Sequence, residues 1–177
     1  MADINITKLL GILIIITTSA CIGIKASDNL NIQLELLRKM KQLIILIGGE
    51  IKYNNSYLGQ AFKNVSDRIS APYDELMVYV ADKLDNRTGE SLETIWKEGI
   101  DKTLSKSGLT KKHLLKLSEL GETLGYLDKD MQIANFELFI ERLDFEINES
   151  TEKNKANCKL YKSLGVLSGI LIVVLII

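Results

Sequence analysis

The chain has little of what most catalytic and metal sites are built from. Among 177 residues it has one histidine, His113, and two cysteines, Cys21 and Cys158. Zinc sites need three or four protein ligands drawn mainly from these residue types, and two cysteines make no disulfide framework. We therefore expect no metal site and no cofactor. A lone histidine near a predicted helix start, such as His113, is expected to be solvated.

Nucleotide-binding motifs are also absent. No Gly-Lys-Ser or Gly-Lys-Thr tripeptide occurs, so the chain has no Walker loop. The segment ELGETLGYLDKDMQ, residues 119–132, contains two glycines four residues apart, but it follows a helical pattern and no strand, so a dinucleotide fingerprint lacks its context. A net charge of -1 disfavours nucleic-acid binding. The sequence predicts a protein that is not an enzyme and binds no nucleic acid.

Long apolar runs are what the sequence does contain. LLGILIIITTSACIGI lies between Lys8 and Lys25, and SLGVLSGILIVVLII follows Lys162 to the C-terminus. A membrane-spanning helix needs about 20 mainly apolar residues, and flanking lysines can extend a shorter run by reaching toward the headgroups. We predict transmembrane helices at residues 4–25 and 163–177, so that membrane lipid is an expected partner.

The N-terminal run has a competing interpretation as a cleaved or lipidated secretion signal. Small residues precede Cys21, as they precede many cleavage sites, but a lipoprotein signal normally has an aliphatic residue where Thr18 stands. Retention as an anchor is therefore favoured. Lysine and arginine residues cluster after the first run and before the second, which predicts that the middle of the chain is cytoplasmic. Only Lys8 favours the opposite orientation.

The middle of the chain predicts an all-α bundle. It holds the one proline, Pro72, and apolar residues recur at helical spacings over residues 27–147. We expect a helix to begin with Ser27 or Asp28 as its N-cap, and further helices to be capped by Ser91 and Thr110.

The last predicted helix has the clearest pattern. An apolar stripe with steps of three and four residues indicates packing in a bundle. The stripe consists of Ile133, Phe136, Ile140, Leu143 and Ile147. Residues 148–162 are polar but compatible with a helix, so we predict a helical stalk that continues toward the membrane segment at residues 163–177.

Glycines mark two predicted packing sites. We predict that Gly121 permits close helix packing, that Gly125 ends a helix as its C-cap, and that Asp128 caps the long helix that follows. Gly165 and Gly169 form a Gly-x-x-x-Gly motif that lets another membrane helix approach closely. The alternative is that glycine is simply frequent in membrane helices.

These segments carry a family resemblance. LGETLGYLDKDMQ (120–132), ending at Gln132, and the C-terminal SLGVLSGILIVVLII resemble the stage III sporulation protein AB family. EIKYNNSYLGQA (50–61), with Glu50 and Tyr53, and the segment around Trp96 fit its weaker central pattern, so these three residues are candidates for the core or an interface. Leu127 departs from the serine that the family usually carries there.

The resemblance implies a protein of endospore-forming bacteria, in the mother-cell membrane that faces the forespore. It implies a non-enzymatic scaffold of a channel between the two cells, with the other proteins of the stage III sporulation A operon as partners, including its cytoplasmic ATPase. It also implies a soluble domain similar to that of the type II secretion system F protein. Self-association through the membrane helices is a further expectation.

Two other functions fit the same residues. One is a platform subunit of a type II secretion or pilus-like system outside sporulation, which vegetative expression would favour. The other is a lipid-anchored binding protein outside the cytoplasm, which labelling of Cys158 by a membrane-impermeant thiol reagent in intact cells would favour.

Overall fold

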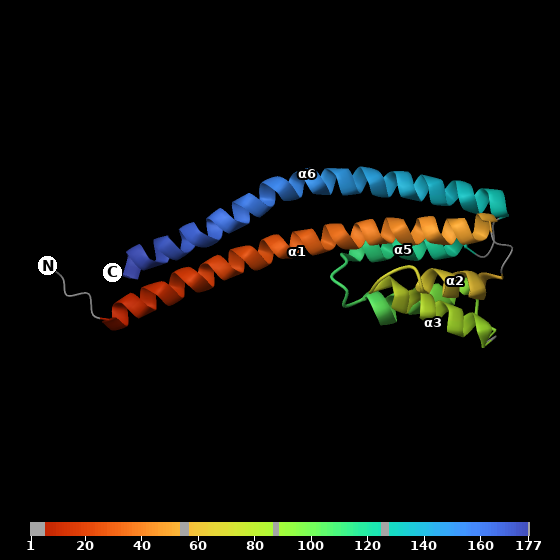
Figure 1. Ribbon diagram of the computed structural model, residues 1–177, viewed down its shortest axis with the longest axis horizontal. Coiled ribbons are helices and arrows are strands. Elements are labelled where there is room, and N and C mark those ends of the chain that lie inside the picture. Colours follow the sequence, from red (N-terminus) through yellow and green to blue (C-terminus); the bar gives the residue numbers. More distant parts are fainter. Residues whose placement is uncertain (1–5, 54–56, 87–88, 125–127, 177) are drawn as a thin grey trace. The chain divides into compact units, whose positions relative to one another are not determined.

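The computed structural model describes residues 6–53, 57–86, 89–124 and 128–176, and within them the chain is helical and contains no strand (Figure 1). The elements are α1 (Ile6–Tyr53), α2 (Leu58–Ser66), α3 (Tyr73–Asp85), α4 (Leu92–Gly99), a π-helical turn η1 (Ile100–Leu104), α5 (Lys111–Thr123) and α6 (Lys129–Ile176). The predicted all-α fold class, a helical bundle with an apolar helix at each end of the chain, is confirmed.

The described residues form two compact units. One contains the chain up to Ile32 together with the chain from Glu149 onward, and we call it the helix pair. The other is Gln33–Asn148, which we call the helical domain. The long helices α1 and α6 each contribute residues to both units.

The predicted helix start at Ser27 is wrong. Helix α1 is continuous from Ile6 to Tyr53, and Ser27 lies in its interior, fully buried. No glycine or proline interrupts residues 24–47, so the helix has no reason to end between the membrane segment and the polar segment that follows. The predicted caps at Ser91 and Thr110 are confirmed, because their side chains accept the backbone N–H groups of Thr94 and His113.

Two aromatic side chains organise the core of the helical domain. Tyr73, at the start of α3, is fully buried and donates its hydroxyl to the carbonyl of Leu36 on α1 over 2.9 Å. Trp96, on α4, is also fully buried and donates Nε1–H to the carbonyl of Leu117 on α5 over 2.7 Å. A buried aromatic ring with a satisfied polar atom contributes both apolar burial and orientation. The two side chains therefore tie α3 to α1 and α4 to α5.

The predicted stripe on the last helix faces this core. Phe136, Leu143 and Ile147 are buried, and Ile140 packs partly buried against the core. Close approach to α1 is possible because Gly48 has no side chain: a Cβ atom there would lie 3.3 Å from the Phe136 ring. The N-terminal part of α6 is thus an integral helix of the domain.

Both long helices have the length and composition of membrane-spanning helices. In the helix pair, large apolar side chains are exposed along both, as expected of surfaces that face lipid. They include Leu9, Leu10, Leu13, Ile14, Leu164, Leu167, Leu171 and Val174.

Gly121 lies directly beneath Trp96. A Cβ atom at Gly121 would lie 2.6 Å from Cγ of Trp96, closer than real contacts allow. We predict that Gly121→Ala lowers the free energy of unfolding by about 1–3 kcal/mol, because overpacking outweighs the better helix propensity of alanine. Denaturant unfolding of the full-length protein in detergent measures this.

Gly49→Ala is the matched control on α1. A Cβ atom at Gly49 would meet no atom within 4 Å. Its substitution should leave stability unchanged or raise it by up to ~1 kcal/mol. Equal stabilities of the two variants would contradict the close contact at Trp96.

Candidate functional site

The junction between α5 and α6 places two of the motif residues, Asp128 and Gln132. Asp128 accepts the backbone N–H of Met131 through Oδ1 over 2.9 Å, which is the contact of an N-cap. Gln132 is 9% exposed and donates Nε2–H to the carbonyl of Leu124 over 2.9 Å. That carbonyl is at the C-terminal end of α5, where backbone acceptors lack helical partners. Gly125 lies outside the described residues.

Gln132 therefore satisfies an acceptor at the end of one helix from the first turn of the next. The Gln132 bond spans eight residues of sequence and holds the end of α5 against the start of α6. With Gly121 under Trp96, the segment LGETLGYLDKDMQ supplies contacts that position helices. Any direct role of these residues in binding a partner stays a prediction.

The other predicted residues lie in three different environments. Glu50, 5% exposed, accepts hydrogen bonds from Asn64 over 3.0 Å and from Arg68 over 3.2 Å, so it connects α1 to the end of α2. Trp96 is core. Tyr53 is 78% exposed at the end of α1. Of the three, Tyr53 is the residue whose side chain is available to a partner.

Glu146 forms a polar cluster that sequence reasoning missed. This α6 carboxylate accepts hydrogen bonds from Lys112 over 2.9 Å and from Lys116 over 2.7 Å, and lies 3.4 Å from Nε2 of His113. All three partners are on α5. The expectation of a solvated His113 is wrong: it is 7% exposed and packs between α5 and α6. The spacing of Lys112, His113 and Lys116 over one helical turn was the available signal.

Burial and charge oppose each other in this cluster. Burial alone would raise the pKa of Glu146, but hydrogen bonds from Lys116 and Lys112 outweigh it and lower that pKa to about 2. Burial lowers the pKa of His113, and the nearby Glu146 carboxylate only partly offsets it. Glu146 is therefore anionic and His113 neutral near pH 7, which makes the cluster a packed ion network.

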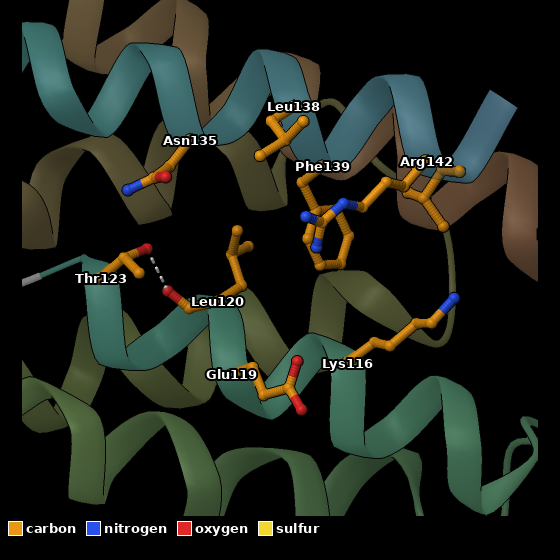
Figure 2. A pocket seen from close by; sticks show the side chains of 9 residues that line it. Lys116, Glu119, Leu120, Thr123, Asn135, Leu138, Phe139 and Arg142 are labelled. Carbon is orange, nitrogen blue, oxygen red and sulfur yellow. Dashed lines mark hydrogen bonds between the residues drawn. The ribbon is translucent and has the colours of Figure 1, made fainter.

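A shallow groove of about 200 Å³ runs between the same two helices. Figure 2 shows Glu119, Leu120 and Thr123 on α5 facing Leu138 and Phe139 on α6 across it. Its walls are mainly apolar, and Lys116, Glu119 and Arg142 place charges at its edges. Such a groove suits a protein segment better than a small charged substrate, because few polar groups converge in it.

The Gly-x-x-x-Gly motif packs within the chain, in the helix pair. A Cβ atom at Gly165 would lie 2.9 Å from the carbonyl oxygen of Ser19 and 3.0 Å from Cα of Gly23. A Cβ atom at Gly169 would lie 3.1 Å from Cβ of Ser19. Ser19 also donates its hydroxyl to the carbonyl of Gly165 over 2.6 Å. Small residues and a hydroxyl hydrogen bond are the means by which membrane helices associate without a hydrophobic driving force.

The contact between the two helices continues in the polar part of the helix pair. Asn154 donates to the carbonyl of Leu30 over 2.8 Å, and the Cys158 thiol lies 3.6 Å from the carbonyl of Ser27. Residues of the predicted stalk thus lie beside α1. Cys158 and Cys21 are free thiols.

The described part of the chain has few of the residue types that catalytic and metal sites use. No group of three or more histidine, cysteine or carboxylate residues there is placed to hold a metal ion. The charged clusters tie helices together, and the one tryptophan, Trp96, is in the core.

Comparison with known proteins gives one consistent answer. A family model described as stage III sporulation protein AB matches residues 8–177. The stage III sporulation protein AB of Bacillus subtilis is 25% identical over 169 residues, covering 96% of this chain and 98% of that protein. The match therefore includes the helical domain and both apolar segments.

A solved structure supports the same fold. A chain titled stage III sporulation protein AB aligns with a TM-score of 0.62 at 22% identity, covering 68% of this chain and 94% of that chain. At this identity the likeness supports the helical fold.

The ion network predicts a pH dependence of stability. Because the folded pKa of Glu146 is about 2, below its ordinary 4.5, its contribution is complete above pH 4.5 and is lost as the pH falls toward 2. The lowered pKa of His113 adds a loss of stability as the pH falls below its ordinary 6.5.

We predict that Glu146→Gln is less stable than wild type at pH 7, because Lys112 and Lys116 lose the negative charge of the Glu146 carboxylate. The difference should shrink as the pH falls from 4.5 toward 2, where the wild-type carboxylate becomes neutral. Melting temperatures of the two proteins across this range measure it. Glu35→Gln, at an exposed pair with Lys39, is the control and should show a small difference. A constant Glu146→Gln difference would count against the network.

Proposed function

Because this chain belongs to the stage III sporulation protein AB family, we propose that it is a non-enzymatic membrane scaffold of the channel between mother cell and forespore. It docks the cytoplasmic ATPase of the same assembly on its helical domain and is needed for forespore development after engulfment. The observation that carries this proposal is the extent of the family match, which includes both candidate membrane segments and the domain.

The two units supply the two parts that a scaffold needs. In the helix pair, the seam of Ser19, Gly23, Gly165 and Gly169 holds two apolar helices together with their large side chains outward, which suits an anchor in lipid. In the helical domain, the aromatic core and the Glu146 network keep the surface in a defined shape. A preorganised surface loses less conformational entropy when it binds a partner.

ATPase docking rests on likeness of architecture. A type II secretion F-like domain is a small helical bundle beside membrane helices, and such platforms couple an ATPase to membrane machinery. By the family resemblance, we expect the helical domain here to share this plan. We therefore assign energy conversion to the partner and positioning to this chain.

The location follows from the same reasoning. We propose the mother-cell membrane that faces the forespore, with the helical domain in the cytoplasm. Positive residues flank the apolar segments on the side of the domain, as is typical of cytoplasmic segments.

Sporulation and docking are tested separately. Deletion of the gene should arrest sporulation after engulfment, and the wild-type gene supplied elsewhere should restore spores. Normal spore yield from the deletion strain would overturn the sporulation role in this organism.

Docking is tested by cross-linking and co-purification of the tagged full-length chain from sporulating membranes. The operon's ATPase should be recovered, and it should be absent from an untagged strain. Arrested sporulation without recovery of the ATPase would leave the sporulation role standing and overturn docking. Expression during vegetative growth would instead favour a secretion platform outside sporulation.

Orientation is tested with a single engineered cysteine. Val78 on α3 is 47% exposed, so Val78→Cys in a chain with Cys21→Ser and Cys158→Ser presents one accessible thiol on the helical domain. A membrane-impermeant thiol reagent should label it after lysis and leave it unlabelled in intact cells. Labelling before lysis would place the helical domain outside the cytoplasm.

A further inference from the structure

Helix α6 carries a second apolar stripe, on the side of the helical domain that faces solvent. Met131, Leu138 and Phe145 are 53%, 46% and 74% exposed. They are spaced seven residues apart, and two helical turns bring each to within about 20° of the one before. Phe136 and Leu143, which are buried in the core, lie on the opposite side of the helix.

This exposed stripe differs from ordinary surface apolarity. Single exposed apolar residues are common on soluble proteins and need no explanation. Three large apolar side chains in line at a heptad spacing form the row that a coiled-coil partner covers. Phe145 is the most exposed of the three, so a partner that covers it removes the most apolar surface from water.

Charges beside the stripe indicate what covers it. If the stripe occupies the a positions of a heptad, Glu137 is at a g position and Arg142 is at the following e position. In parallel coiled coils, a g residue of one helix contacts the e residue five positions later on the other. Glu137 and Arg142 are separated by five positions and opposite in charge. Neither has an ion-pair partner in the described part of the chain.

The same charges disfavour the antiparallel arrangement. Antiparallel helices bring g positions together, which would place acidic Glu137 of one copy near acidic Glu137 of the other. The Glu137 and Arg142 pair is therefore attractive when two copies run in the same direction and in register. The next such pair, Asp144 and Glu149, is acidic at both positions, but each carboxylate is already paired with a lysine of its own chain, Lys41 and Lys153.

We propose that α6 of a second copy of this chain packs along Met131, Leu138 and Phe145, parallel and in register, with Glu137 of each copy paired with Arg142 of the other. Glu141 is at a d position, where the two carboxylates approach each other, so the association is weak and reversible. This interface is distinct from the membrane seam, whose small residues pack within one chain. It does not depend on the sporulation role or on ATPase docking.

Cysteine cross-linking of the full-length protein in membranes tests the parallel register. In a chain with Cys21→Ser and Cys158→Ser, Met131→Cys and Leu138→Cys should each form disulfide-linked dimers on mild oxidation. Val78→Cys, at 47% exposure on α3, is the control matched to Leu138, and its dimer yield should be at least several-fold lower.

Charge exchange tests the pairing. In the Leu138→Cys background, Glu137→Arg or Arg142→Glu alone should weaken association about ten-fold, because two attractive pairs become repulsive. The double variant Glu137→Arg with Arg142→Glu should restore it. Glu141→Gln should strengthen association, because it removes the repulsion in the seam. Melting temperatures equal to that of the parent establish that each variant is folded.

Three results would overturn the proposal. The first is a Leu138→Cys dimer yield no higher than that of Val78→Cys, which would mean that another partner or none covers the stripe. The second is dimers of Leu138→Cys together with mixed Met131→Cys and Phe145→Cys dimers but no Met131→Cys self-dimers, which would show antiparallel packing. The third is a double charge exchange that fails to restore association in folded protein.

Discussion

Trp96 packs directly over Gly121, and this contact sets how closely α4 and α5 approach each other. The indole ring is fully buried, and its centroid lies 6.0 Å from that of the Phe62 ring. Its Nε1–H donates to the carbonyl of Leu117. Any side chain at Gly121 would occupy the space of the indole. The position of α5 then determines that of α6, because the end of α5 presents the carbonyl that Gln132 binds and its exposed side presents the lysines that pair with Glu146.

Polar side chains in the helical domain act mainly as ties between helices that are distant in sequence. Glu50 joins α1 to the end of α2, and Glu146 joins α6 to α5. A buried carboxylate is costly unless its hydrogen-bond capacity is met, so each of these residues favours one arrangement of its helices over looser alternatives. This suits a scaffold, whose function depends on presenting a surface of constant shape.

Helix α6 makes different contacts on its different sides and in its different segments. In the helical domain one side is buried in the core, and the opposite side carries the exposed stripe, whose Leu138 also lines the groove with α5. In the helix pair its glycines meet Ser19 and Gly23 of the same chain. The small residues of the membrane segments thus contact each other within one chain. The exposed stripe is therefore the better candidate for the contact between two copies of the chain.

The sequence by itself determined what depends on neighbouring residues. Helical periodicity, the caps at Ser91 and Thr110, and the two apolar runs were predictable because each depends on a few consecutive residues or on composition. Tertiary structure alone decided the burial of His113, the Glu146 network, and the pairing of Gly165 with Ser19 and Gly23. These outcomes depend on which distant helix lies beside a residue, and local periodicity carries no information about that.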